Sequence, residues 1–329
     1  MIKYYQFFVF LWVLAFLSLS DCVKSATKNE VTKKIIVDKE GKGNFATLQE
    51  AINSIRAFDP DGPTLIIVKN GVYHEKIIIP DYICNIKIMG EDKEKTLITY
   101  DDYVGKDNMG TFRTYTLQVR GNDIWLENLT IENAAGPVGQ AVALDTEGDR
   151  IVVKNCRLLG NQDTVYTGGE GNRLFFYQCY IEGTTDFIFG SATAWFEDCE
   201  LHCKRDSYIT AASTPQNIDY GYIFNHCKVT LEEGVTSVYL GRPWRPYAMT
   251  VFMNCELPKG INPAGWYNWG NPENEKTARY AEFNNKGEGA KTDQRIKWSK
   301  ILTPQEAGQI TFDKVLKNDF FKKITFLLQ

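Results

Sequence analysis

Between residues 124 and 259 the chain repeats one pattern of apolar and polar positions. Six ten-residue segments align without gaps, and their first residues are 27, 23, 20, 28 and 28 residues apart. In each segment the third and eighth positions are apolar, the first is mostly apolar, and the sixth is a cysteine in all but one. The segments are 124–133, 151–160, 174–183, 194–203, 222–231 and 250–259. A period of about 20–50 residues is typical of solenoid proteins.

Each segment contains a change of phase that a straight strand cannot accommodate. Side chains of a strand alternate between its two faces, so the apolar positions one and three would face away from positions six and eight. A corner between the two sets removes this conflict, and the fifth position carries polar residues, most of which tolerate a positive φ. These corner residues are Asn128, Asn155, Gln178, Asp198, His226 and Asn254. The pattern predicts an all-β fold, a parallel β-helix of short strands whose turns stack about 4.8 Å apart.

Other segments extend this coil and close its ends. Less regular strand-like stretches precede the repeat at residues 65–71, 77–79, 84–90 and 116–121. A helical stretch at 47–55, which Thr47 could cap, is expected to cover the bare strand edges at the amino end. A second short helix opens at Thr303. Because no linker rich in Pro, Gly or Ser interrupts the chain, we predict a single domain over residues 33–322.

Residues 1–25 have the character of a secretory signal peptide. Lys3 precedes an apolar run over residues 7–19, which is shorter than a membrane span. A bacterial lipoprotein signal ending at Cys22 is the alternative, and Asp21 beside that cysteine fits it poorly. No other segment is apolar enough to cross a membrane. We therefore expect a secreted, extracellular protein with no membrane partner.

Composition and charge argue against several classes of function. The formal net charge is −4, which predicts no basic surface for nucleic acid. The three histidines have no metal-ligand spacing, which argues against a histidine-built metal site and a Ser–His hydrolase.

Five of the eight cysteines share the sixth position of the repeat, which is compatible with a buried column of small side chains. Cys179 and Cys199 are only 20 residues apart on adjacent turns, so a disulfide between them is an equal alternative.

The register of the repeat brings two acids together. Asp163 and Asp186 each follow the first residue of their segment by twelve positions, within the parallel sequences 160–166 and 183–189. We expect them one above the other on adjacent turns, with backbones about 5–6 Å apart. Carboxyl groups this close resist being ionised together, so one keeps its proton near neutral pH. Such a pair can act as an acid with a nucleophile or base; a calcium site or two solvated loop acids are the alternatives.

Residues near the two acids favour catalysis. The amides of Gln140 and Gln162 could donate to a developing oxyanion without changing the charge balance. Arg242 could hold one aspartate ionised through a bidentate hydrogen bond. The aromatic residues that could line a groove and stack on sugar rings are Tyr166, Phe187, Trp244, Trp266 and Trp269. Together these residues favour a surface that binds carbohydrate.

Five motifs around these residues occur in the order found in one known family. They are Gly71-Val-Tyr-His-Glu75, Gln140-Ala-Val-Ala-Leu144, Gln162-Asp-Thr-Val-Tyr166, Asp186-Phe-Ile-Phe-Gly190 and Leu240-Gly-Arg-Pro-Trp244. From about residue 35 to residue 300 the sequence closely resembles the pectin methylesterases, or pectinesterases, of carbohydrate esterase family 8. The resemblance implies a single-stranded, right-handed parallel β-helix of the pectin-lyase-like type with short capping helices. It also implies a carboxylic-ester hydrolase that removes methyl esters from the galacturonate units of pectin and releases methanol.

The catalytic roles of that family carry over residue by residue. Asp186 matches the nucleophile that attacks the ester carbonyl. Asp163 matches the acid that protonates departing methanol and then the base that activates water. Gln140 and Gln162 match the donors to the oxyanion, and Arg242 matches the residue that orients the nucleophile. The resemblance implies no metal and no cofactor.

The resemblance also assigns substrate contacts and partners. Thr116 matches a threonine that touches the substrate, and Trp244 matches a stacking tryptophan. The candidate substrate-binding residues are Thr116, Gln140, Tyr166, Phe187, Arg242, Trp244 and Trp266. The expected partners are methyl-esterified pectin and a proteinaceous inhibitor, for a monomer located outside the cell or in the cell wall. Asp145 departs from the arginine common in plant members, so a basic residue beside the groove is missing.

Two other functions stay open on the sequence. The first is a β-helical pectin depolymerase. A polygalacturonase of this kind would use paired acids, and a pectate lyase would use a calcium cluster. Asp101 and Asp102 are an adjacent acid pair, but they lie far from the catalytic register in sequence. A non-catalytic pectin-binding protein would typically have lost Asp163, Asp186 or Arg242, and all three are present.

Overall fold

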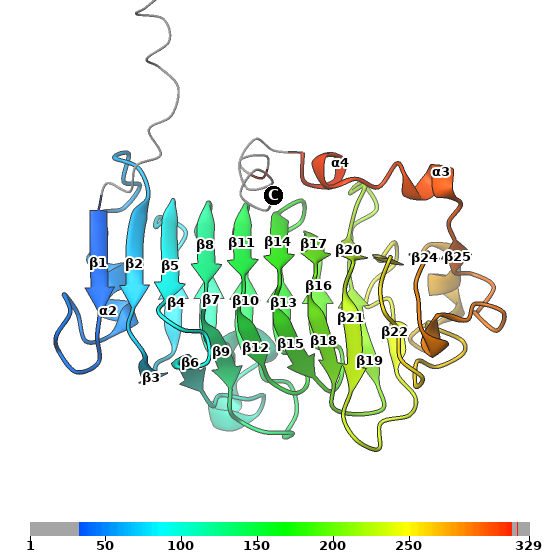
Figure 1. Cartoon of the computed structure of the whole chain (residues 1–329), viewed down its shortest axis with the longest axis horizontal. Helices are drawn as coiled ribbons and strands as arrows, with labels where there is room; N and C mark the ends of the chain where they lie inside the picture. Colours follow the sequence, from blue (N-terminus) through cyan, green and yellow to red (C-terminus); the bar gives the residue numbers. More distant parts are fainter. Residues whose placement is uncertain (1–32, 318–320, 322–329) are drawn as a thin grey trace, which may run out of the picture.

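The chain winds into a right-handed parallel β-helix, as its repeat and its family resemblance predict (Figure 1). The computed structural model describes residues 33–317 and residue 321. The predicted signal peptide therefore lies outside the described residues. Within them, an 11-stranded sheet A and two seven-stranded sheets, B and C, enclose one apolar interior.

The strands of each sheet are parallel to their neighbours and follow one another along the coil axis. Sheet A contains β1 Lys33–Val37, β2 Thr64–Val68, β5 Ile86–Gly90, β8 Ile124–Glu127, β11 Ile151–Lys154, β14 Arg173–Tyr177, β17 Thr193–Glu197, β20 Tyr222–Asn225, β23 Met249–Met253, β24 Arg279–Phe283 and β25 Lys300–Ile301. Sheet B contains β3 Gly71–His74, β6 Thr96–Tyr100, β9 Thr130–Asn133, β12 Arg157–Leu159, β15 Tyr180–Gly183, β18 Glu200–Cys203 and β21 Lys228–Leu231. Sheet C contains β4 Ile77–Ile79, β7 Leu117–Val119, β10 Leu144–Thr146, β13 Val165–Thr167, β16 Ile188–Gly190, β19 Tyr208–Ala212 and β22 Tyr239–Gly241.

A polar corner follows each strand of sheet A across the repeat, and all but the last of these corners lead into a strand of sheet B. All six predicted corner residues have φ between 49° and 57°, the left-handed region that Asn, Asp and His tolerate best. Corner side chains also bond from turn to turn. Asn155 Nδ2 donates to Asn128 Oδ1 at 2.7 Å, and Asn284 Nδ2 donates to Asn254 Oδ1 at 2.8 Å. The predicted change of direction at the fifth position is therefore confirmed.

Aromatic rings at the third position of the repeat stack through the interior. The ring centroids of Phe176, Phe196, Phe224 and Phe252 follow one another at 4.6, 4.4 and 4.4 Å, with nearly parallel planes. Each such pair contributes about 0.5–1.5 kcal/mol beyond the burial of its area. The column holds successive turns in register, and the site described below depends on that register.

The cysteines at the sixth position form a second buried column, and all described cysteines are free thiols. This corrects the alternative of a disulfide between Cys179 and Cys199. The Cys179 thiol donates to Val153 O at 3.3 Å, and the Cys199 thiol donates to Phe176 O at 3.6 Å. Each thiol is thus directed at a carbonyl of the preceding turn. Burial raises the pKa of both thiols well above the usual range, which makes them unreactive.

Short helices cover the coil at its amino end and along one side. The helix α2, Leu48–Asn53, buries its apolar residues against β1 and β4, and the Thr47 hydroxyl accepts the Glu50 N–H at its start. The helices α3, Pro304–Ala307, and α4, Phe312–Leu316, lie along one long side of the coil (Figure 1), and α4 contacts β17 of sheet A. Four 3₁₀ turns lie in the described loops: η1 Lys106–Asn108, η2 Thr111–Arg113, η3 Pro272–Lys276 and η4 Glu288–Ala290. None of the helices in the described ranges has the length and apolarity needed to cross a membrane.

The helix α4 packs on the outer face of sheet A. The Phe312 ring lies 4.9 Å from Phe175 and 5.6 Å from Trp195, both edge-on.

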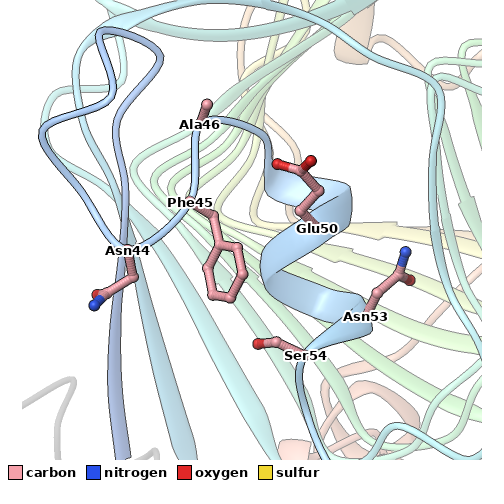
Figure 2. A pocket seen from close by; sticks show the side chains of 6 residues that line it. All are labelled: Asn44, Phe45, Ala46, Glu50, Asn53 and Ser54. Carbon is pink, nitrogen blue, oxygen red and sulfur yellow. The ribbon is translucent and has the colours of Figure 1, made fainter.

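At the amino end, Figure 2 shows a hollow beside α2 whose side chains include Phe45, Glu50 and Asn53. This hollow contains a single carboxyl group, so it lacks the paired acids that the sequence predicts for the active site.

Candidate active site

Two acids stand side by side where the chain passes from sheet B to sheet C. Asp163 and Asp186 each lie two residues before a strand of sheet C, and the pairing of Val165 with Ile188 sets them opposite each other on adjacent turns. The Asp163 N–H donates to Thr185 O at 3.1 Å. Both acids have a left-handed backbone, with φ of 65° and 50°, and both are 5% exposed. This is the placement that the repeat register predicts.

Burial and mutual repulsion make the two carboxyl groups differ in acidity. Loss of hydration raises the pKa of Asp163 to about 8, and the charge of Asp186 adds to the rise. Burial also raises the pKa of Asp186, but the hydrogen bonds and charge of Arg242 oppose that rise. Asp186 therefore loses its proton first, and Asp163 stays protonated near neutral pH. An acid and a nucleophile need this difference.

A fixed guanidinium holds Asp186. Arg242 follows β22, and its Nε and Nη2 donate to the two carboxylate oxygens of Asp186 at 2.9 and 2.6 Å. The guanidinium carbon lies 4.0 Å from the ring centroid of Tyr208 and 3.8 Å from that of Trp269. The two rings on the guanidinium restrict its rotation, and the fork geometry fixes the plane of the carboxylate.

Two glutamines lie beside the same acids. Gln140 pairs with Gln162 in a parallel bridge between adjacent turns, and Ala141 N–H donates to Gln162 O at 3.1 Å. The Gln140 side chain hydrogen-bonds the Asp163 carboxyl group. Both glutamines are partly exposed. Neutral amides in this position can stabilise an oxyanion.

Aromatic rings form a continuous floor on the outer face of sheet C. Ring centroids are 4.8 Å apart for Phe112 and Tyr166, 5.0 Å for Tyr166 and Phe189, and 5.9 Å for Phe189 and Trp244. Tyr166 and Trp244 were predicted here, whereas Phe189 was missed. The sequence does contain its signal, because Tyr166 follows Asp163 by three residues and Phe189 follows Asp186 by three residues.

Three predicted substrate contacts lie inside the coil and cannot touch a ligand in the groove. Phe187 is fully buried, because the residue after a left-handed acid is turned inward, as is Thr164 on the previous turn. Trp266 is 1% exposed and packs 4.6 Å from Tyr280 in the core. Thr116 is also fully buried, and its hydroxyl donates to a backbone carbonyl at 2.8 Å. Trp269, three residues after Trp266, is the tryptophan that reaches the site.

A further acid lies under the same face of sheet C. Asp145 pairs in register with Gln118 on one side and Tyr166 on the other, and it is fully buried. Gln118 Nε2 donates to Asp145 Oδ2 at 3.0 Å. In the part of the chain that the structure describes, Asp145 Oδ1 and Gln118 Oε1 have no hydrogen-bond partner. Burial raises the pKa of Asp145 to about 7, and the charge of Glu147 adds to the rise.

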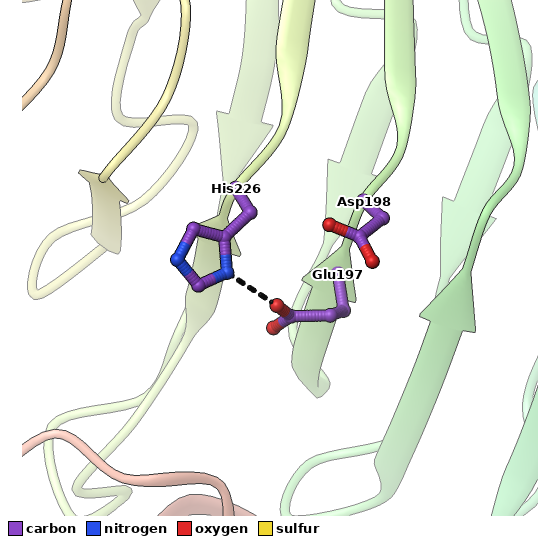
Figure 3. A group of neighbouring side chains, drawn as sticks. All are labelled: Glu197, Asp198 and His226. Atoms are coloured by element: carbon purple, nitrogen blue, oxygen red, sulfur yellow. Dashed lines mark hydrogen bonds and ion pairs between the residues drawn. The ribbon is translucent and has the colours of Figure 1, made fainter. Parts of the chain in front are cut away.

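Of the described residues, one group has the composition of a metal site. Glu197, Asp198 and His226 offer ligand atoms within 4.8 Å of one another (Figure 3). They lie at the corner between sheets A and B, away from Asp163 and Asp186, which precede strands of sheet C. Glu197 already accepts from Trp195 Nε1 at 2.6 Å and Asn225 Nδ2 at 2.9 Å, and His226 Nδ1 lies 2.7 Å from it. These contacts explain the cluster as a hydrogen-bonded corner of the coil.

Comparisons with known proteins agree with this geometry. The family model described as Pectinesterase matches residues 34–319. Pectinesterase 31 of Arabidopsis thaliana is 36% identical over 84% of this chain and 90% of its own length. The probable pectinesterase/pectinesterase inhibitor 23 of Arabidopsis thaliana is 34% identical over 88% of this chain. The chain spans only 53% of that second relative.

Solved structures of similar proteins share the coil. Pectin methylesterase from carrot superposes with a TM-score of 0.85 at 31% identity, covering 91% of this chain and 98% of the carrot chain. A pectin methylesterase in complex with a hexasaccharide gives a TM-score of 0.75 at 30% identity, covering 89% and 98%. The family match extends over most of the chain, and its segment includes both acids, both glutamines and the arginine clamp. The chain belongs to the pectinesterase family.

Proposed function

We propose that this protein removes methyl esters from the galacturonate units of pectin and releases methanol. The observation that carries the proposal is the pair of buried acids, one held ionised by a bidentate arginine and the other kept protonated. The family membership and the matched structure that holds a hexasaccharide support a polysaccharide substrate. The aromatic floor beside the acids suits the apolar faces of sugar rings.

In the first half of the proposed reaction, a carboxylate oxygen of Asp186 attacks the carbonyl carbon of the methyl ester. The carbonyl electrons move to oxygen, and the amides of Gln140 and Gln162 donate to that oxyanion. The intermediate then collapses, and the bond to the methoxy group breaks. Asp163 gives its proton to the departing oxygen, so that methanol leaves and an acyl-enzyme anhydride remains.

In the second half, water attacks the carbonyl carbon of the anhydride. Asp163, now ionised, takes a proton from that water, and the same glutamines stabilise the second oxyanion. Collapse releases the galacturonate carboxylic acid and restores the Asp186 carboxylate, which Arg242 holds in place. Asp163 is again protonated, so no metal or cofactor is needed to close the cycle.

The test is methanol release from highly esterified pectin. We expect methanol without loss of viscosity and without unsaturated product, whereas a depolymerase would reduce the viscosity. Asp186→Asn should abolish turnover while leaving the circular dichroism spectrum unchanged. Asp198→Asn is a matched control, because Asp198 is also left-handed but lies at the opposite corner. Turnover by Asp186→Asn at the wild-type rate would refute the assignment of the nucleophile.

We further propose that the protein is exported and acts outside the cell or in the cell wall. The apolar run at residues 7–19 behind Lys3 supports this proposal, and pectin itself is an extracellular polymer. A proteinaceous inhibitor as partner and a monomeric state remain predictions. Amino-terminal sequencing of the secreted protein would test the cleavage expected after Ser25.

A further inference from the structure

The segment that precedes Gln140 gives this residue little support. It follows β9, which ends at Asn133, and it contains Gly136 with a φ of 81° and Gly139 with a φ of 130°. A Cβ added at either glycine would meet no atom of the described residues within 4 Å. Because glycine has the greatest backbone freedom of all residues, this loop cannot fix the position of Gln140. Contacts with other segments must do so.

The side-chain amide of Asn133 binds three segments close to Gln140. Asn133 is buried at the end of β9, with 3% of its surface exposed. Its Nδ2 donates to Asp102 O at 2.9 Å, to Thr114 O at 3.0 Å and to Val142 O at 3.1 Å. An amide nitrogen carries two hydrogens, so one of them is shared between two carbonyl oxygens. One buried side chain therefore joins three turns of backbone.

Two of these three contacts lead to the backbone on either side of Gln140. Asp102 lies two residues before Val104, whose N–H donates to Gln140 O at 3.0 Å. Val142 lies two residues after Gln140, and its N–H donates to the Thr114 hydroxyl at 3.1 Å. The buried amide thus holds the loop that bonds Gln140 and the peptide that follows it.

The rate of the proposed reaction depends on where Gln140 lies. Its side chain hydrogen-bonds the Asp163 carboxyl group, and its amide is a proposed donor to the oxyanion. Loss of one oxyanion donor costs about a hundred- to a thousandfold in kcat, and a displacement of about 1 Å can cost about a hundredfold. Removal of the Asn133 amide takes a donor from three carbonyl oxygens, so their segments must rearrange to find other partners.

We propose that Asn133 is a positioning residue for catalysis, which holds Gln140 where its amide can donate to the oxyanion. The inference rests on the proposed function, because that oxyanion forms during the proposed hydrolysis of the ester. Asn133 is buried and acts through the backbone of Gln140. It lies outside the five motifs that carry the family resemblance.

The first test compares Asn133→Ala with Asn285→Ala. Asn285 is a matched control, because its Nδ2 donates to Phe252 O at 3.2 Å and its Oδ1 accepts Cys255 N–H at 2.9 Å, in the corner after β24 of sheet A. Both variants should unfold at lower urea concentration than the wild type. Only Asn133→Ala should lower kcat, by about ten- to a hundredfold, with little change in KM. A wild-type kcat in Asn133→Ala, or an equal loss in both variants, would overturn the inference.

The pH profile of kcat/KM separates positioning from a general loss of structure. Burial raises the pKa of Asp163 to about 8, and the hydrogen bond from Gln140 opposes that rise. Displacement of Gln140 in Asn133→Ala should therefore raise this pKa further and move the alkaline limb to higher pH. A weakened fold alone would reduce the amount of active protein and leave the limb in place. An alkaline limb at the wild-type pH would contradict the positioning role.

A double-mutant cycle tests whether Asn133 acts through Gln140. Gln140→Met removes the donor amide and keeps a side chain of similar length. In this background Asn133→Ala should change kcat by less than about twofold, because the group that it displaces is already absent. A further loss of about ten- to a hundredfold would show that Asn133 acts by another route.

Replacements of Thr114 test the same peptide without changing Asn133. Thr114→Val removes the acceptor of the Val142 N–H but keeps the shape of the side chain. It should lower kcat and move the alkaline limb upward, whereas Thr114→Ser, which keeps the hydroxyl, should behave as the wild type. Wild-type kinetics in Thr114→Val would count against the inference. A wild-type protein that releases no methanol from esterified pectin would instead overturn the proposed function.

Discussion

Replacing Asp145 with asparagine tests whether a buried carboxyl group under the groove is neutral in the folded protein. Burial raises its pKa from 3.8 to about 7. An unfolded chain would release this proton near pH 3.8, so between the two values the folded state binds the extra proton. Stability must therefore fall as pH rises through this window. The whole rise in pKa corresponds to about 4 kcal/mol of stability lost above about pH 7.

Asparagine keeps the shape of the side chain and the acceptor for Gln118 Nε2, but it cannot ionise. The free energy of unfolding of Asp145→Asn should therefore lack this dependence on pH. Relative to the wild type, the variant should gain about 2–3 kcal/mol between about pH 5 and about pH 8. Urea titrations at several pH values, followed by circular dichroism, measure this difference directly.

Asp219→Asn is the control for this experiment. Asp219 hydrogen-bonds Lys317 at the surface, and that contact lowers its pKa. It is ionised in both folded and unfolded states above about pH 5, so its replacement should change stability by a constant amount. If the advantage of Asp145→Asn over the wild type were also constant between pH 5 and pH 8, the carboxyl group of Asp145 would be ionised in the folded protein, and the reasoning would fail.

Three further predictions concern the catalytic acids and the cysteines. The pH profile of kcat/KM should be bell-shaped, rising as Asp186 loses its proton and falling at about pH 8 as Asp163 loses its own; a profile that stays flat through pH 8 would contradict this. Arg242→Lys should lower kcat about a hundredfold and move the acidic limb to higher pH, because lysine cannot form the fork; an acidic limb at the wild-type position would show that the clamp does not set the ionisation of Asp186. A reducing agent should leave the unfolding midpoint unchanged, since Cys179 and Cys199 are free; a lower midpoint would indicate a disulfide.

Much of the fold could be predicted because it depends on contacts that recur. The corner at the fifth position and the apolar third position repeat six times, so each copy supports the interpretation of the others. The same register placed Asp163 and Asp186 on adjacent turns, because their distance from the start of the unit is equal. In a solenoid, the position of a residue within its repeat also determines which residues lie next to it on the adjacent turns.

The remaining features depend on places where the repeat breaks. The orientation of Phe187 follows from the left-handed backbone of Asp186, which shifts the alternation of the strand by one residue. The rings of Tyr208 and Trp269 meet Arg242 through loops of unequal length, which no periodicity describes. In the sequence, Asp145 has the pattern of an ordinary strand residue. Its burial results from the side chains packed around it, which the sequence pattern does not indicate. The contacts made by irregular loops and the burial of single side chains could therefore not be predicted from the sequence.

The stacked phenylalanines described above have a consequence for how this catalyst can vary. Because the two acids stand on consecutive turns, their separation is set by the pitch of the backbone, about 4.8 Å, and the stacked rings of Phe176 and Phe196 help to maintain that register. Loops between rungs can lengthen or shorten without altering this interval, and whole rungs could be added at either end. Backbone hydrogen bonds between successive turns fix the spacing of the turns along the coil axis. We therefore expect the loops that border the groove to vary in length, while the spacing between Asp163 and Asp186 stays constant.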